Sequence, residues 1–120
     1  MRKITALIGG TLLGAAAWGA GALISGVFEP FDSLSGFLVV QSALAIATAL
    51  TGFRAGAGAL AALLLGHYLG LNLYPYVMGG AETRAWALLA AVTTIFLIII
   101  PALVGGVAVL ARKWRRTGAE

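Results

Sequence analysis

The sequence contains no cysteine, which removes disulfide bridges and thiolate metal ligands from consideration. It also contains a single histidine, His67, and its long apolar segments carry no Asp or Glu. A zinc site needs three or four protein ligands, which one histidine cannot supply. Nucleophilic and acid–base catalysis need an activated pair of side chains within reach of one another, and the sequence offers no such pair. We therefore expect no enzyme activity, no metal site and no cofactor.

Charged residues are scarce as well. They make up 10% of the 120 residues, and hydrophobic residues make up 61%, whereas a soluble domain carries about 25% charge. The charged residues are separated by apolar segments of about 20 residues, a length that crosses a hydrocarbon core about 30 Å thick. The net charge of +4 comes from basic residues beside apolar segments, where they indicate orientation and contact with anionic lipid. We expect the chain to lie in a lipid bilayer and to have no nucleic-acid partner.

Helix-ending residues divide the apolar sequence into four parts. We expect one all-α domain over residues 1–120, an integral membrane protein with four transmembrane helices in an up-down bundle. The spans are expected at about residues 4–28, 34–53, 55–74 and 84–111. Pro30 ends the first helix and Asp32 or Ser33 caps the second. Arg54 lies in a short glycine-rich turn, and Pro101 is expected to kink the fourth helix.

The first segment has a second interpretation. Its basic start and apolar run are also typical of a secretory signal peptide. The apolar run continues through Phe28, however, which is longer than the apolar region of such a peptide. We therefore expect it to remain as a spanning helix.

Small residues recur every three or four positions in each predicted helix, which places them on one face. Such seams let two helices approach closely, and van der Waals packing then holds them together in lipid. The glycines expected at helix contacts are Gly10, Gly14, Gly21, Gly66, Gly70 and Gly105. A chain with 17 glycines also produces such spacings by chance. Both origins stay open for any single pair.

Polar side chains within the predicted helices are the candidates for a ligand site or a transport path: His67, Gln41, Thr48 and Tyr74. His67 lies twelve residues beyond Ala55, about 18 Å into the membrane at 1.5 Å per residue, a depth at which ionisable groups are usually functional. The spans hold no carboxylate to pair with it, so a neutral hydrogen-bonding role between helices is the alternative. Gln41 and Thr48 share one helix face and allow the same two interpretations.

Two functions fit these residues. The first is a structural or accessory subunit that acts through helix–helix association, either with itself or within a larger membrane complex. Small-residue seams and scarce polar groups favour it. The second is a transporter or channel for a small solute or ion, with Gln41, Thr48 and His67 lining a path. Because four helices barely enclose a pore, this second function requires a homo-oligomer.

Lysine and arginine predict the orientation of the chain. Of the eight, seven lie at the N-terminus, in the Arg54 turn or in the C-terminal tail, and only Arg84 lies in the other two connections. Basic residues favour the cytoplasmic side of a membrane. We therefore predict a multi-pass protein of the cell membrane with both termini in the cytoplasm.

Single introduced cysteines test this orientation without background, because the sequence has none of its own. Cysteines placed after Asp32 and near Gly80 should react with a membrane-impermeant thiol reagent applied to intact cells. A cysteine beside Arg54 should react only after the cells are opened. Labelling of an added C-terminal cysteine from outside the cell would contradict the predicted orientation.

Overall fold

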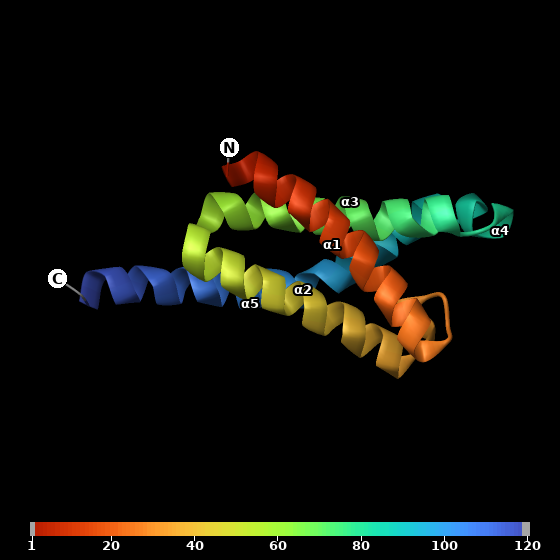
Figure 1. The fold of residues 1–120 in the computed structure, drawn as a ribbon, viewed down its shortest axis with the longest axis horizontal. Helices are drawn as coiled ribbons and strands as arrows, with labels where there is room; N and C mark the ends of the chain where they lie inside the picture. The colour runs from red at the N-terminus through yellow and green to blue at the C-terminus, as the bar shows by residue number, and fades with distance from the viewer. Residues whose placement is uncertain (1, 119–120) are drawn as a thin grey trace.

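The computed structural model describes residues 2–118, which form helices and no β-strand (Figure 1). The elements are α1 (Arg2–Ser25), the 3-10 turn η1 (Pro30–Asp32), α2 (Leu34–Ala55), α3 (Ala57–Met78), α4 (Ala81–Ala85) and α5 (Ala87–Gly118). The long helices α1, α2, α3 and α5 are each long and apolar enough to cross a membrane. The predicted all-α class and the four membrane-length segments are confirmed, and they indicate a multi-pass membrane protein.

Two glycines with positive φ set the ends of the first two helices. α1 ends at Ser25, earlier than predicted, because Gly26 adopts a φ of 74° and its N–H bonds to the Ala22 carbonyl at 2.9 Å. α2 and α3 are joined by Gly56 alone, at a φ of 87°. Only glycine adopts such angles without strain. The turn is therefore as short as predicted but lies two residues later, and Arg54 belongs to α2.

The start of α2 follows the sequence pattern more closely. Glu29, before Pro30, is extended at φ −91° and ψ 132°. Ser33 caps α2, and its hydroxyl accepts a hydrogen bond from the Gly36 N–H at 3.2 Å. Of the two predicted cap residues, Asp32 and Ser33, it is Ser33 that caps the helix.

Two further boundaries differ from the predicted ones, because α3 continues through a proline and the connection after it contains a short helix. α3 was expected to end at Tyr74, but it continues through the buried Pro75 to Met78. A proline removes one backbone donor, and the following turn still closes when Gly79 N–H bonds to the Pro75 carbonyl at 2.8 Å. The fourth segment begins with the separate helix α4, and α5 starts only at Ala87.

α5 runs without interruption through Pro101 to Gly118. The chain therefore does not form a loop that returns to the same side at this position. The kink at Pro101 stays a prediction.

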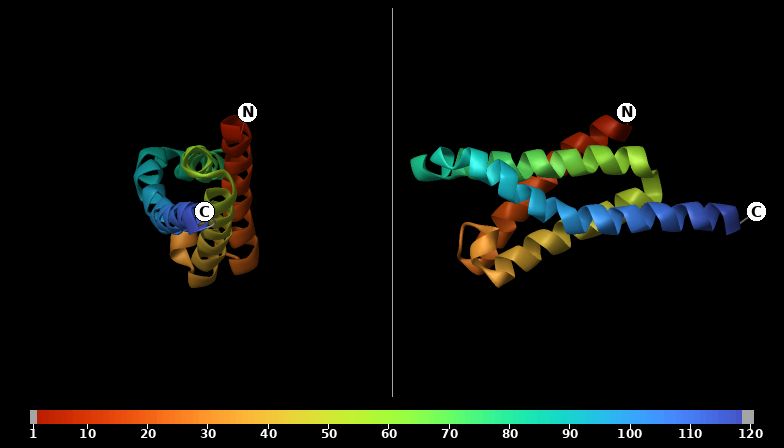
Figure 2. Two further views of the ribbon diagram at one scale, coloured as in Figure 1. Left: turned by 90° about the vertical axis from the view of Figure 1, so that its left-hand side faces the viewer. Right: turned by 180° about the vertical axis from the view of Figure 1, so that it is seen from behind.

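Chain ends and connections are divided between the two ends of the molecule. The N-terminus, the Gly56 turn and the C-terminus lie toward one end of the long axis, and the α1–α2 and α3–α4–α5 connections lie toward the other (Figures 1 and 2). We name the first the basic end, since it carries the arginine-rich end of α5. The second is the acidic end, since Glu29, Asp32 and Glu82 lie in its connections and in α4.

Helices that are not neighbours in the sequence make the most extensive contacts: α1 packs against α3, and α2 against α5. A Cβ atom added to Gly10 would lie 2.5 Å from the Leu63 carbonyl oxygen, and one added to Gly14 would lie 2.6 Å from that of His67. The residue numbers of the contacting pairs increase together along the two helices, so α1 and α3 run parallel. Gly66 and Gly70 meet the backbone of α1 from the other side, at Leu7, Gly10, Thr11 and Ala15.

The remaining contacts also use small residues. A Cβ atom on Gly52 of α2 would lie 2.6 Å from the Gly105 carbonyl oxygen of α5. One on Gly21 of α1 would lie 3.0 Å from the Gly36 carbonyl oxygen of α2. The structure therefore places all six glycines named from the sequence at contacts between helices of the same chain.

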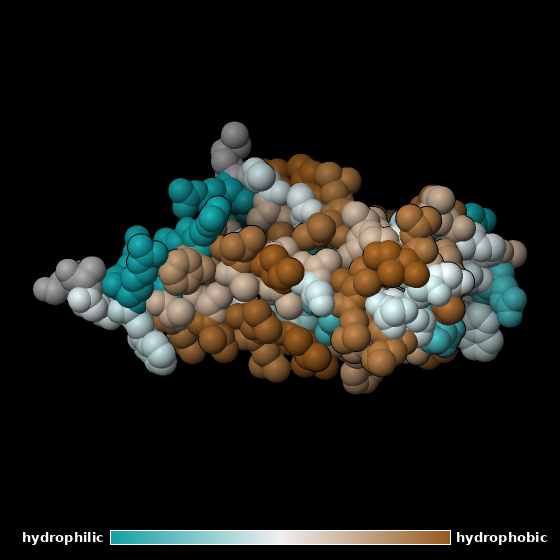
Figure 3. Space-filling model, turned by 60° about the horizontal axis from the view of Figure 1, so that its bottom comes forward, coloured by the Kyte–Doolittle hydropathy of each residue, from teal (hydrophilic) through white to brown (hydrophobic). Residues whose placement is uncertain are grey.

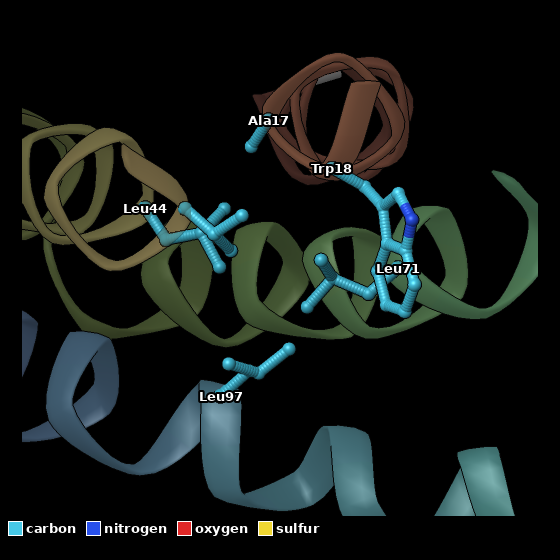
Figure 4. Close-up of a cluster of buried hydrophobic side chains, with 6 residues drawn as sticks. Ala17, Trp18, Leu44, Leu71 and Leu97 are labelled. Carbon is cyan, nitrogen blue, oxygen red and sulfur yellow. The ribbon is translucent and has the colours of Figure 1, made fainter. Parts of the chain in front are cut away.

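Much of the surface of the described chain is apolar. Exposed large hydrophobic side chains outnumber the buried hydrophobic ones, and they cover most of the middle of the molecule, with hydrophilic residues gathered toward the ends (Figure 3). The small core cluster contains Leu44, Leu71 and Leu97 beside Trp18 (Figure 4). Such an exposed apolar area is expected of a protein surrounded by lipid rather than water.

Gly9 and Gly10 provide a matched test of the α1–α3 contact. Gly10→Ala should lower the free energy of unfolding by about 1–3 kcal/mol, because its Cβ cannot fit against the α3 backbone. Gly9 has open space around it, so Gly9→Ala should leave stability unchanged or raise it slightly through helix propensity. Thermal unfolding in one detergent, followed by circular dichroism, measures both. Equal effects of the two substitutions would contradict the close contact.

Candidate functional site

His67 is fully buried, and its ring joins α3 to α1. Its Nδ1 atom lies 2.9 Å from the carbonyl oxygen of Gly10. A carbonyl oxygen accepts, so Nδ1 carries the proton and donates. The other ring nitrogen, Nε2, is buried and has no hydrogen-bond partner among the described residues. The histidine thus serves the α1–α3 contact with one nitrogen and leaves the second unused.

Gln41 bonds to a carbonyl that proline has left without its helical donor. Its Nε2 donates to the Leu97 oxygen at 2.8 Å, from α2 to α5. Leu97 lies four residues before Pro101, which has no N–H to bond back to it. In lipid a freed carbonyl needs a replacement donor from a neighbouring helix, and Gln41 supplies it. The amide oxygen Oε1 of Gln41 is buried without a partner among the described residues.

Thr48 and Tyr74, the other two predicted site residues, also lie at helix contacts. Thr48 is fully buried, bonds to the Ala45 carbonyl of its own helix at 3.0 Å and packs against Gly105. The Tyr74 ring stacks on Phe28 with centroids 6.2 Å apart. Gln41 and Thr48 thus face α5, while His67 faces α1. These residues do not converge on one site within the chain.

Sequence reasoning missed a polar contact between α3 and α5. The Tyr68 hydroxyl donates to the Ala91 carbonyl at 2.5 Å, and Asn72 Nδ2 donates to the Thr94 hydroxyl at 3.0 Å. Tyr68 and Asn72 are four residues apart and therefore share a helix face. An asparagine within an apolar helix is a signal in its own right, because its amide needs partners at membrane depth.

Two cavities lie between α3 and α5 toward the acidic end. The smaller, about 310 Å³, has Tyr68 and Asn72 in its wall. The larger, about 770 Å³, is bounded by the α1–α2 connection, the end of α3, α4 and the start of α5. Trp18, buried to 3% exposure, also lines the larger cavity, and its indole Nε1 has no acceptor among the described residues.

Within residues 2–118, no group of three His, Asp or Glu residues is placed to hold a metal ion. The described polar groups bond mostly to helix carbonyls, as His67, Gln41 and Tyr68 do. No protein-family model, curated protein or solved structure matches this chain. Its function therefore has to be inferred from its own residues and their geometry.

A double-mutant cycle tests the role of Gln41. Gln41→Met keeps the side-chain length but removes the donor, so the Leu97 carbonyl loses its partner. In a Pro101→Ala background the alanine supplies a backbone N–H that can bond to that carbonyl instead. We expect Gln41→Met to cost about 1–2 kcal/mol more in the parent than in the Pro101→Ala protein. Denaturant unfolding of the four proteins measures the coupling. Equal costs would show that the two sites are independent.

The tautomer of His67 is directly observable, because the chain has one histidine. Protein labelled with ¹⁵N-histidine should give one pair of ring signals at neutral pH, with Nδ1 protonated and Nε2 unprotonated. The Gly10 carbonyl accepts only from a protonated Nδ1, and this fixes the expected tautomer. Gly9→Ala should leave the ring signals unchanged. Protonation of Nε2 with a bare Nδ1 would contradict the α1–α3 hydrogen bond.

Proposed function

We propose that the chain is one four-span membrane domain of the cell membrane, an up-down bundle with both termini in the cytoplasm. Support comes from the exposed apolar surface and from the division of charge between the two ends. The positive-inside rule assigns the basic end to the cytoplasm. Arg112 lies at this end, where its guanidinium donates to the Phe53 carbonyl at 3.1 Å and to the Arg54 carbonyl, at the C-terminus of α2.

Within that membrane setting, we propose that the protein acts as a structural or accessory subunit rather than as a carrier. The observation behind this is the use of its buried polar side chains. His67, Gln41 and Tyr68 each bond to a backbone carbonyl of another helix. A transport path needs polar groups that face a common passage and can exchange partners with a solute. These three side chains instead hold separate pairs of helices together, which suits a role in stabilising the helix bundle.

The glycine seams support this proposal less than the sequence suggested. All six named glycines pack inside the chain, so they are not available for a partner. Contacts with a second copy or with a larger complex would use the exposed apolar faces, where Gly9 and Gly106 have open space around them.

A homo-oligomeric transporter or channel is the second candidate. The observation in its favour is that two of the three buried atoms without a described partner, Nε2 of His67 and Oε1 of Gln41, belong to the predicted path residues. A polar atom left unbonded in a low-dielectric interior costs about 1–3 kcal/mol. Such atoms call for an explanation, and a functional role is one. In this function the two atoms would gain partners in another conformation or from a bound solute.

Purification from its own membrane in a mild detergent separates the two functions. For an accessory subunit we expect other membrane proteins in fixed ratio to the chain, and no solute or proton flux when the chain alone is placed in vesicles. The alternative predicts an oligomer of this chain alone with a pH-dependent flux. His67→Gln should abolish that flux without lowering the melting temperature, because Gln does not become cationic near neutral pH. That result would overturn the accessory role.

A further inference from the structure

The cavity of about 770 Å³ at the acidic end has the size of a ligand site, since such sites span about 300–1,000 Å³. Its walls come from five parts of the chain, namely Trp18 of α1, the α1–α2 connection, the end of α3, α4 and the first turns of α5. Its chemistry is given by charge at the rim, aromatic rings in the wall and one unsatisfied donor.

All acidic residues of the described chain, Glu29, Asp32 and Glu82, line this cavity, and no lysine or arginine of residues 2–118 does. None of the three carboxylates forms an ion pair or a hydrogen bond with another described side chain. Arg84, the basic residue closest in sequence to Glu82, instead donates to the Tyr76 carbonyl at 2.8 Å. Three uncompensated negative charges therefore surround the cavity and favour a cation.

Aromatic rings form much of the wall. Trp18, Phe28, Phe31 and Trp86 line the cavity, and the rings of Trp18 and Phe28 meet edge to face with centroids 5.9 Å apart. The faces of such rings attract ammonium groups, and quaternary ammonium ions are recognised by aromatic cages for this reason. The aromatic rings and the carboxylates thus favour the same class of ligand, an organic cation.

Trp18 adds an observation that is independent of charge. It lines the cavity while being 3% exposed, and its indole N–H has no acceptor among the described residues. Figure 4 shows the indole nitrogen on the side of the ring that faces away from Leu44 and Leu97. A buried tryptophan N–H usually has a partner. An acceptor atom on a bound molecule would supply it.

We propose that this cavity binds an organic cation, in which a quaternary or protonated amine is joined to an apolar body that carries a hydrogen-bond acceptor. The amine lies among the carboxylates and aromatic rings, and the acceptor meets Trp18. Two sources supply this chemistry: a free solute, and the choline head group of a membrane lipid. The proposal goes beyond the accessory role and does not depend on it, because binding requires only the folded chain.

Benzoylcholine is the probe, measured by calorimetry on the intact protein in phosphatidylglycerol nanodiscs, with empty nanodiscs as the reference. Its neutral analogue, 3,3-dimethylbutyl benzoate, has the same shape with carbon in place of the quaternary nitrogen. We expect saturable binding of benzoylcholine and at least about tenfold weaker binding of the analogue. A variant with Glu29→Gln, Asp32→Asn and Glu82→Gln should bind benzoylcholine more weakly than the parent and prefer it less strongly over the analogue, because only the aromatic rings then favour the cation. These side chains make no bonds to other described side chains, so its melting temperature should match that of the parent.

Trp18→Phe removes the indole N–H donor and keeps an aromatic ring. It should weaken benzoylcholine binding by about three- to tenfold, the effect of one hydrogen bond. It should leave binding of (3-phenylpropyl)trimethylammonium, which has no ester, unchanged. Trp114→Phe is the matched control, because Trp114 is exposed and lies in the C-terminal part of α5.

Three results would overturn the proposal: no saturable binding of benzoylcholine in the millimolar range, equal affinity of the cation and its neutral analogue for the parent protein, or unchanged affinity of the folded triple variant. Replacing half of the phosphatidylglycerol with phosphatidylcholine, and in a matched control with an uncharged galactolipid, identifies the source, because both remove the same surface charge and only one supplies choline. A lower apparent affinity for benzoylcholine with phosphatidylcholine than with the galactolipid assigns the cavity to the lipid head group, and equal affinities assign it to a free solute.

Discussion

The backbone contact between α1 and α3 is the interaction on which the other helix contacts depend. Lipid offers no hydrophobic force that drives two helices together, so close van der Waals packing must do so. Gly10, Gly14, Gly66 and Gly70 remove the side chains that would keep the two backbones apart. The same approach brings the His67 ring within 2.9 Å of the Gly10 carbonyl. α2 and α5 repeat the arrangement at Gly52 and Gly105.

The second constraint is that every backbone polar group needs a partner where water is absent. Pro101 leaves the Leu97 carbonyl without its helical donor, and the Gln41 side chain donates to it instead. The C-terminus of α2 leaves carbonyls without helical donors, and Arg112 bonds to two of them. These side chains thus supply the missing hydrogen-bond donors for carbonyls of neighbouring helices. This use explains why a chain with so few polar groups places several of them in its interior.

The two ends of the molecule are built differently. At the basic end, α2 and α3 are joined by one residue and Arg112 bonds α5 to α2, and the cavity there, about 280 Å³, is lined by arginines and Phe53. At the acidic end the connections are longer and include η1 and α4, and the helices leave a larger cavity of about 770 Å³ lined in part by carboxylates. Incomplete packing and unpaired charge suit a ligand site better than the bonded polar residues of the interior do.

The sequence by itself determined the all-helical class, the four membrane-length helices and Ser33 as a cap of α2. These follow from apolar length and from capping, which are local properties. It also singled out six of the glycines that lie at helix contacts. It did not fix where the helices end, because α1 ends before Gly26, α2 before Gly56, and α3 continues through Pro75. It did not indicate that α1 pairs with α3 and α2 with α5, or that His67 and Gln41 face different helices. Seams of small residues on every helix are compatible with several pairings. Only the tertiary structure decided which backbones meet, because that depends on how all four helices fill space together. The carbonyl that each buried polar side chain reaches follows from that choice.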